Sequence, residues 1–177
     1  MQTDHVSSQP PAHYPETNPQ LDLVLQRTVD VTCAQVWAAW TTPELLMQWF
    51  CPSPWKTVEC DIDLRPGGAF RTVMESPEGQ KFPGEGCYLE VVPHRRLTWT
   101  SVLKGGFRPS NDPSGGPDFT CVLTFEPSGA DGNSTRYTAH AMHRNAEGAQ
   151  AHAKMGFQDG WGSALDQLVA LMKRCAP

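Results

Sequence analysis

Six segments between residues 56 and 143 alternate apolar and polar side chains, and most are separated by turn-forming stretches rich in Gly, Pro, Asn or Ser. A two-residue period interrupted by such turns predicts β-strands joined as hairpins, which form an antiparallel sheet. In the third segment, "FPGEG" (82–86) adds a proline and two glycines, so we expect a bulge or sharp bend that curves the sheet. The predicted strands are 56–64, 68–75, 81–92, 96–104, 118–126 and 134–143.

Helical patterns flank these strands. The segment "LDLVLQRTV" (21–29) predicts one further strand, after which Thr32 and Gln35 have the spacing of a helix capping box. Pro43 suits the first turn of a second short helix. From about residue 146 to 174, apolar side chains recur on one helical face. We therefore predict an α+β protein with a helix-grip fold: a seven-stranded curved antiparallel sheet wrapped around a long C-terminal helix, with two short helices between the first and second strands.

Three glycines, Gly156, Gly160 and Gly162, occur where this long helix begins, in "MGFQDGWGSALDQL" (155–168). Each costs a helix interior about 0.5–1 kcal/mol relative to alanine, so a compensating role is expected. Polar residues within the stretch argue against a membrane dimer seam, and the helical pattern before it argues against a phosphate cradle. On a helical projection Gly160 lies at the edge of the apolar stripe, where a missing side chain leaves space against the sheet. Gly162 falls on the opposite, solvent side, and together with Gly156 it is expected to permit a kink or break.

Composition narrows the function classes. A net charge of −5 argues against nucleic acid as a partner, because phosphate binding needs a basic face. Residues 1–20 contain four prolines and few large apolar side chains, which predicts a disordered tail ahead of a single domain at 21–177. No signal-peptide pattern or membrane-spanning apolar run is evident, so we expect a cytoplasmic protein without membrane insertion. The six scattered cysteines predict reduced thiols, and we expect neither a metal site nor a covalent cofactor.

Four segments of the chain resemble, in order and spacing, the START-like (SRPBCC, helix-grip) superfamily. Within it, the chain is most similar to bacterial proteins related to the C-terminal domain of the activator of the ninety-kilodalton heat-shock protein ATPase. The resemblance covers nearly all of residues 21–171, and it implies a cavity between sheet and C-terminal helix that in many relatives holds a small apolar ligand. It does not imply one chemistry, because the superfamily includes lipid carriers, cyclases and hydrolases. The matching segments are "VWAAWTTPELLMQWFCP" (36–52), "DLRPGGAFRTVM" (63–74), "GCYLEVVPHRRLTWT" (86–100) and "GFQDGWGSALDQL" (156–168).

One departure from this family concerns its partner. The chaperone activators carry a large separate N-terminal domain, which the twenty residues of the predicted tail cannot replace. Direct activation of a chaperone is therefore not expected, while an accessory role for a chaperone or in a stress response stays an alternative, and a homodimer is possible.

Strand alternation and the helical face suggest which residues line the cavity. Phe, Trp and Tyr side chains predominate among them, as in a mixed apolar pocket, while packing into a dry core is the alternative for each. The candidate ligand-binding residues are Trp49, Phe50, Phe70, Thr72, Met74, Tyr88, Trp99, Ser101, Phe119, His143, His152, Phe157, Gly160 and Trp161.

Histidines are the main titratable candidates. His140 and His143 are an odd number of positions apart, so an undistorted strand points them to opposite faces, whereas His143 and His152 could converge at the mouth of the cavity as base or ligand. The carboxylates Glu75, Glu85 and Glu90 are more typical of solvated cross-strand pairs. The leading hypothesis is binding of a small hydrophobic or amphipathic ligand, and the main alternative is a cyclase- or hydrolase-type enzyme acting in the same cavity.

A last feature is the Gly- and Pro-rich segment 104–118, which is longer than a hairpin connection needs. The sequence leaves open whether it is a surface loop or a flap at the cavity entrance.

Overall fold

The structure of the protein is a computed structural model that describes residues 16–110 and 116–175. Its strands are β1 (Asp22–Val29), β2 (Lys56–Ile62), β3 (Ala69–Glu75), β4 (Lys81–Val92), β5 (Arg96–Thr100), β6 (Leu103–Lys104), β7 (Arg108–Pro109), β8 (Phe119–Ser128) and β9 (Ser134–His143). Its helices are α1 (Cys33–Thr41), α2 (Pro43–Leu46), α3 (Ala146–Lys154) and α4 (Phe157–Arg174).

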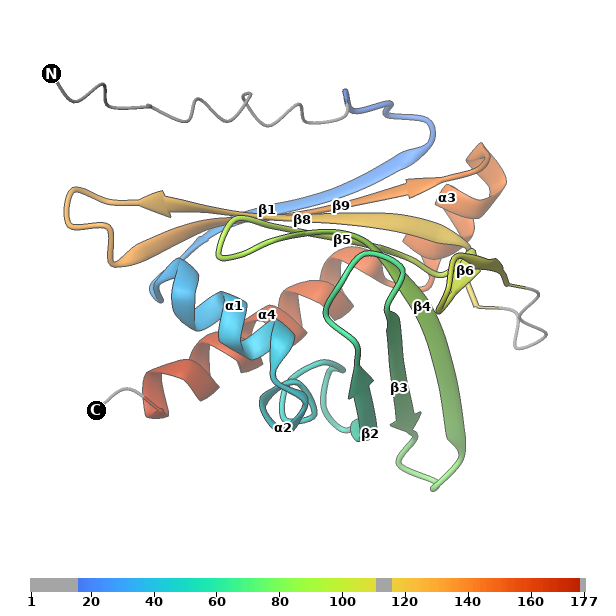
Figure 1. Cartoon of the computed structure of the whole chain (residues 1–177), viewed down its shortest axis with the longest axis horizontal. Coiled ribbons are helices and arrows are strands. Elements are labelled where there is room, and N and C mark those ends of the chain that lie inside the picture. Colours follow the sequence, from blue (N-terminus) through green and yellow to red (C-terminus); the bar gives the residue numbers. More distant parts are fainter. Residues whose placement is uncertain (1–15, 111–115, 176–177) are drawn as a thin grey trace, which may run out of the picture.

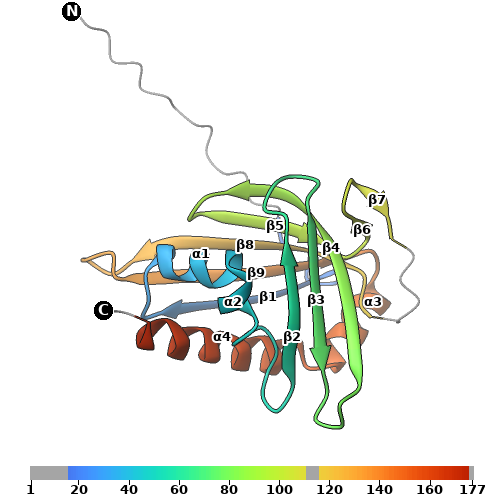
Figure 2. The same ribbon diagram turned by 60° about the horizontal axis from the view of Figure 1, so that its bottom comes forward.

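Seven of these strands form one antiparallel sheet in the order β1-β9-β8-β5-β4-β3-β2, and β6 and β7 form a separate small hairpin. The sheet is so strongly curved that β2, β3 and β4 stand across the direction of the other strands, and α4 crosses beneath it (Figures 1 and 2). Helices α1 and α2 lie on the same side of the sheet as α4 (Figure 2). The predicted fold class and helix-grip architecture are confirmed.

The first helix begins where its capping box predicts. The Thr32 hydroxyl accepts from the Gln35 backbone N–H at 3.2 Å, and the Gln35 side-chain oxygen accepts from the Thr32 N–H at 2.9 Å. Two N–H groups that a helix start otherwise leaves without partners are thereby satisfied. Pro43 occupies the first turn of α2, where a missing N–H costs nothing. Both short helices thus start at positions fixed by local sequence.

The long C-terminal helix differs from expectation in being two helices. Gly156 has φ +93°, a left-handed conformation that favours glycine, and it separates α3 from α4. The predicted break therefore occurs at Gly156 alone. Gly162 lies inside an uninterrupted α4 and does not face solvent, because a Cβ there would lie 3.9 Å from Leu25 and Arg27 of β1. The apolar face of α4 packs into the core through Phe157, Ala164, Leu165, Leu168, Leu171 and Met172.

Two details of the strands also differ from the sequence-based prediction. Residues 82–86 pair with β3 without a shift in register, so the bulge expected there is absent, and β4 instead shifts against β5 between Tyr88 and Glu90. Gly86 allows a close approach, since a Cβ there would lie 2.8 Å from the Thr100 carbonyl oxygen. The fourth predicted strand ends at Thr100, and residues 103–104 belong to the β6–β7 hairpin.

Residues 1–15 of the predicted tail and residues 111–115 of the Gly- and Pro-rich segment lie outside the described residues. Residues 16–20 are exposed, and the Leu21 N–H donates to the Asn18 carbonyl at 3.0 Å in a turn before β1. All six cysteines are free thiols. None of the described helices is both long enough and apolar enough to cross a membrane.

Candidate functional site

A cavity of about 370 Å³ lies between the concave side of the sheet and α4, and we call it the sheet–helix cavity. This volume falls within the range of about 300–1,000 Å³ that is typical of small-molecule sites. Half of its lining residues are Trp or Phe, and among the described residues no Asp, Glu, Lys or Arg contributes to it. The lining residues are Trp40, Trp49, Phe50, Cys51, Pro52, Trp55, Met74, Trp99, Phe119, His152, Met155, Gly156, Phe157, Gly160, Trp161 and Ala164.

Edge-to-face ring contacts build the aromatic wall. The Trp40 and Trp49 rings are 4.9 Å apart at 73°, and the Trp99 and Phe119 rings are 5.2 Å apart at 67°. Such tilted aromatic pairs add about 0.5–1.5 kcal/mol beyond their burial. These residues come from α1, the loop before β2, β5 and β8, so elements distant in sequence form one rigid apolar surface.

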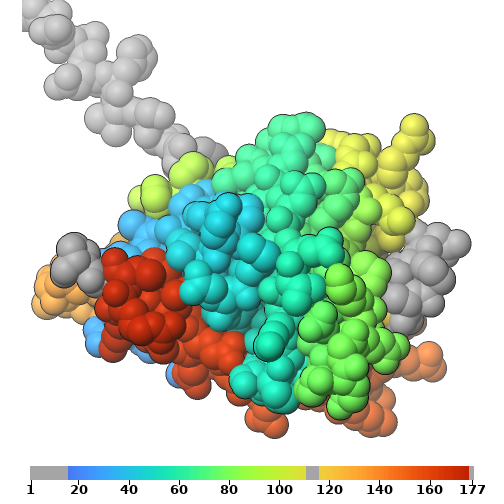
Figure 3. Space-filling view, turned by 90° about the horizontal axis from the view of Figure 1, so that it is seen from below, coloured from blue at the N-terminus to red at the C-terminus, as the bar shows by residue number. Residues whose placement is uncertain are grey.

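The entrance is marked by two exposed apolar side chains. Trp55 is 37% exposed and Met155 is 68% exposed, and both line the cavity. Trp55 precedes β2, while Met155 lies in the turn between α3 and α4. On the face shown in Figure 3, α4, the segment around α2 and the outer end of β4 lie next to one another. The described residues of the 104–118 segment do not line this cavity.

Glycine contributes space to the cavity at position 160. A Cβ built on Gly160 would meet no atom within 4 Å, and the residue lines the cavity. The backbone N–H of Gly160 donates to the Gly156 carbonyl at 2.8 Å, so α4 is regular at this point. The open volume is thus due to the missing side chain and not to a distorted helix.

One side chain of α4 fixes the opposite wall. The Gln167 amide nitrogen donates to the carbonyls of Trp49 and Cys51 at 3.0 and 2.8 Å, and its oxygen accepts from the Ser53 N–H at 3.0 Å. These three bonds tie the loop after α2 to α4. Because this loop lacks the regular backbone hydrogen bonds of a helix or sheet, its position in the cavity wall depends on such side-chain partners.

A second polar contact orients the indole of Trp161. Its Nε1–H donates at 2.9 Å to the hydroxyl of Tyr137, which is buried and does not line the cavity. Burial raises the pKa of Tyr137, so the phenol stays neutral at physiological pH.

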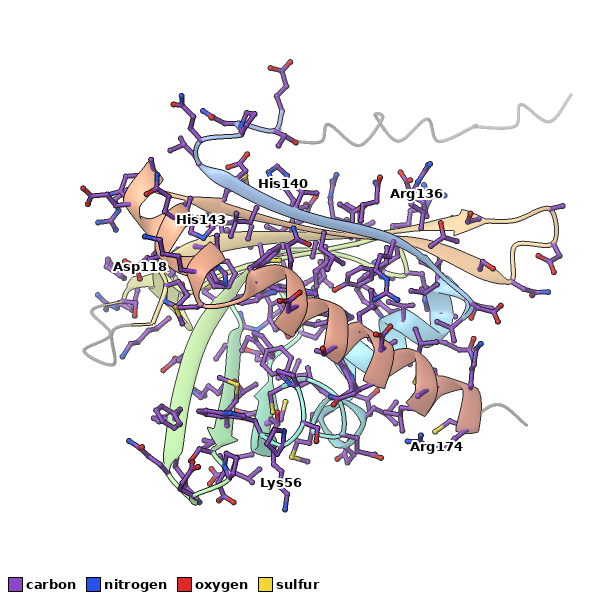
Figure 4. All side chains as sticks on the ribbon, turned by 180° about the vertical axis from the view of Figure 1, so that it is seen from behind. Lys56, Asp118, Arg136, His140, His143 and Arg174 are labelled. Atoms are coloured by element: carbon purple, nitrogen blue, oxygen red, sulfur yellow. The ribbon has the colours of Figure 1, made fainter. Side chains whose placement is uncertain are left out.

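Two histidines meet at one end of the cavity, as the sequence suggested. His143 ends β9 at its junction with the helix that follows (Figure 4), and its Nδ1 lies 2.9 Å from the Leu21 carbonyl oxygen. Its Nε2 lies 2.9 Å from Nδ1 of His152 on α3, and the His152 ring lies against Phe119 and Phe157. Burial, and then the neighbouring His143, lower the pKa of His152 to about 4. His140 points to the other face of the sheet, where its Nε2 is 2.8 Å from a carboxylate oxygen of Asp22.

Of the fourteen candidate residues named from the sequence, nine line the cavity. They are Trp49, Phe50, Met74, Trp99, Phe119, His152, Phe157, Gly160 and Trp161.

The other five lie around the cavity without lining it. Phe70 and Tyr88 are buried behind the wall, with Phe70 packed between Phe50 and Trp99. Thr72 borders a separate polar hollow with Arg71 and Glu85. Ser101 follows β5, and its hydroxyl donates to the Pro117 carbonyl. His143 is hydrogen-bonded to His152, which lies between it and the cavity.

Seven lining residues were missed by sequence reasoning: Trp40, Cys51, Pro52, Trp55, Met155, Gly156 and Ala164. Trp40 carries a helical core pattern that gives no indication of a cavity, and the five residues that lie in loops have no periodicity. Ala164 was the one with a usable signal, since it shares the apolar face of Trp161.

The arginine and glutamate side chains that the sequence offered as candidates lie outside the cavity. Arg71 contacts Asp61 at 3.1 Å and Glu85 at 3.2 Å on the exposed side of the sheet, and Glu90 contacts Arg96 at 2.6 Å. Burial raises the pKa of the Cys51 thiol in the cavity wall, which keeps it protonated and a poor nucleophile. Within residues 16–110 and 116–175, no group of three His, Cys, Asp or Glu side chains is placed to hold a metal ion.

Comparison with known proteins shows which family has this sequence and fold. A family model described as Activator of Hsp90 ATPase homolog 1-like protein matches residues 30–173. A solved structure of a protein from Nitrosomonas europaea is 45% identical, with a TM-score of 0.83, and the match covers 89% of this chain and 97% of that one. A protein from Mycobacterium smegmatis is 28% identical, with a TM-score of 0.69, and covers 86% of this chain and 90% of its own.

A more distant structure, an AHSA1 protein from Silicibacter pomeroyi, is 22% identical with a TM-score of 0.62 over 88% of this chain and 99% of that one, which shows a shared fold. None of the curated proteins compared is significantly similar to the chain. Because the family model spans most of the sequence and the Nitrosomonas relative matches over almost its whole length, the chain belongs to the Activator of Hsp90 ATPase homolog 1-like family of the START-like superfamily.

Proposed function

We propose that the protein binds a small hydrophobic or amphipathic molecule in the sheet–helix cavity. The observation that carries this proposal is the uncharged, half-aromatic lining of a cavity of about 370 Å³. Transfer of apolar surface from water into such a site is favourable by about 25 cal/mol per Å². A charged ligand would lose its hydration without meeting a counter-charge, which costs several kcal/mol. The site therefore favours an uncharged ligand body.

The entrance supports an amphipathic ligand as well as a wholly apolar one. Trp55 and Met155 expose apolar surface beside the opening, so one end of a bound molecule can reach water while the rest is buried. Among the described residues three large hydrophobic side chains are exposed, namely Trp55, Met155 and Phe107, and the first two lie at the cavity. The exposed apolar surface is thus concentrated at the cavity and gives less support to a separate chaperone-binding patch.

An acid–base enzyme acting in this cavity receives less support from the chemistry of the lining. A general base works best with a pKa near the operating pH, whereas the pKa of His152 is lowered to about 4. Cys51 is protonated, and no carboxylate lines the cavity within the described residues. We therefore do not propose a reaction. The chaperone or stress-response role, the homodimer and the cytoplasmic location stay predictions.

A ligand panel tests the proposal. Naphthalene derivatives, long-chain alcohols and flavonoids would be added to the purified full chain while the melting temperature and tryptophan fluorescence are recorded. A ligand at one hundred times its Kd stabilises the folded state by about 2.7 kcal/mol, which corresponds to a rise of about 5–10 °C in Tm for a domain of this size. Gly160→Leu should abolish both responses. If no compound stabilises the wild type more than this variant, the proposal is wrong.

A further inference from the structure

The polar end of the sheet–helix cavity is a chain of two histidine rings that starts at a backbone carbonyl. The Leu21 carbonyl oxygen can only accept, so His143 Nδ1, at 2.9 Å from it, carries the proton. His143 is 6% exposed, its ring lies against the Phe119 and His152 rings, and no carboxylate is paired with it among the described residues. A neutral imidazole carries a proton on one ring nitrogen and a lone pair on the other.

The neutral form of His143 determines the tautomer of His152. With its proton on Nδ1, His143 presents a lone pair at Nε2, and His152 Nδ1 must therefore donate across the 2.9 Å between them. Neutral His152 then keeps a lone pair on Nε2. Within the part of the chain that the structure describes, no hydrogen bond is made by this second nitrogen, and His152 lines the cavity.

We propose that His152 Nε2 is a fixed hydrogen-bond acceptor that selects cavity ligands carrying a hydroxyl group on an otherwise apolar, uncharged skeleton. This inference rests on the proposed function and specifies its ligand class. A carboxylate would place its own lone pairs against that of Nε2 and would find no cation in the lining. The hydroxyl donates to Nε2, and the rest of the molecule lies among Phe119, Phe157 and the tryptophans.

The acceptor role is consistent with the weak basicity of the ring. Because the pKa of His152 lies at about 4, the ring accepts a hydrogen bond without taking up the proton near neutral pH. His143 is accordingly a positioning residue that holds the tautomer and does not touch the ligand.

The binding test uses two matched probes, 2-naphthol and 2-methoxynaphthalene, which have the same ring system and differ in the hydroxyl proton. Titration calorimetry on the wild type should give a Kd for 2-naphthol about three- to tenfold lower, the effect of one net hydrogen bond. In His152→Phe, which keeps an aromatic ring between Phe119 and Phe157, the ratio of the two Kd values should fall to about one. The control His94→Asn alters an exposed histidine with φ +61°, which Asn tolerates, and should keep the wild-type ratio.

The main spectroscopic test uses the wild type, so it does not depend on a variant that could misfold. Nitrogen-15 NMR of the wild type should show His152 protonated on Nδ1 and unprotonated on Nε2, with the Nε2 signal shifting on addition of 2-naphthol. In His143→Phe the two His152 tautomers should become mixed.

Three results would overturn the inference while leaving ligand binding intact: a proton on His152 Nε2, equal binding of both probes by the wild type, or an unchanged preference in His152→Phe. Failure of both probes and of every compound in the ligand panel to bind would instead refute the proposed function together with this inference.

Discussion

Substitutions at Gly160 can test separately whether its missing side chain provides space for a ligand and what that glycine costs in helix stability. Gly160 lies near the start of α4, and a Cβ there meets no atom within 4 Å. Gly160→Ala should therefore stabilise the protein by the helix-propensity difference of about 0.5–1 kcal/mol, with no steric cost. For a domain of this size that is a rise of about 1–4 °C in Tm.

Gly160→Leu keeps nearly the same propensity gain and extends three further carbons into the cavity. At about 0.8 kcal/mol per buried methylene, contact with the aromatic wall adds up to about 2 kcal/mol, less any cost of overpacking. The folded state should thus be at least as stable as the wild type, while the volume needed by a ligand is lost. Stability and binding are expected to change in opposite directions, which is not the usual behaviour of a disruptive core mutation.

The assay combines thermal unfolding with titration of 2-naphthol followed by tryptophan fluorescence. Ala170→Leu is the matched control, because it places the same side chain at an exposed position of the same helix. It should leave ligand affinity unchanged. Destabilisation by Gly160→Ala, or wild-type affinity in Gly160→Leu, would refute the reasoning that the missing side chain creates the ligand space.

Two further predictions concern the walls of the cavity. Gln167→Ala removes three hydrogen bonds to the backbone of residues 49–53, so it should lower the free energy of unfolding, measured by urea titration, by about 1–3 kcal/mol. The control Gln158→Ala removes one bond to the Val24 carbonyl and should cost less. Equal losses in the two variants would contradict the role assigned to Gln167. Because the pKa of His152 is about 4 in the folded protein and 6.5 ordinarily, the unfolded chain binds the proton first, so stability should fall as the pH drops from 7 towards 4. After allowance for the partial exposure of this ring, the free energy of unfolding should fall by about 1 kcal/mol between pH 7 and pH 5. Chemical denaturation at the two pH values should show this loss in the wild type and not in His152→Phe. An unchanged pH dependence in the variant would count against the burial of His152.

Local sequence patterns predicted most of the secondary structure because each depends on neighbouring residues. The alternation at 81–92 and 134–143 predicted β4 and β9 at their observed bounds, and the Thr32 capping box marked the start of α1. A bulge or sharp bend was expected at residues 82–86, whereas the register shift of this strand lies between Tyr88 and Glu90, since a bulge depends on how two strands pair and not on the glycines of one strand.

The histidines show how far a periodicity argument extends into the site. Their odd spacing predicted that His140 and His143 face opposite sides of the sheet, as observed. The link from His143 to Leu21 could not be predicted, because it requires β1 to pair with β9 across more than a hundred residues.

The sequence by itself determined the strands, the helix starts, the break at Gly156 and the apolar face of α4, because hydrogen bonding and side-chain direction within an element repeat with its own period. Tertiary structure alone decided which aromatic rings border open space. Alternation assigns Phe70 and Met74 to the same face of β3, yet Phe70 is covered by Phe50 and Trp99 while Met74 lines the cavity. Open volume is the difference between the space that sheet and helix enclose and the side chains that fill it, so it depends on every element that contributes a wall.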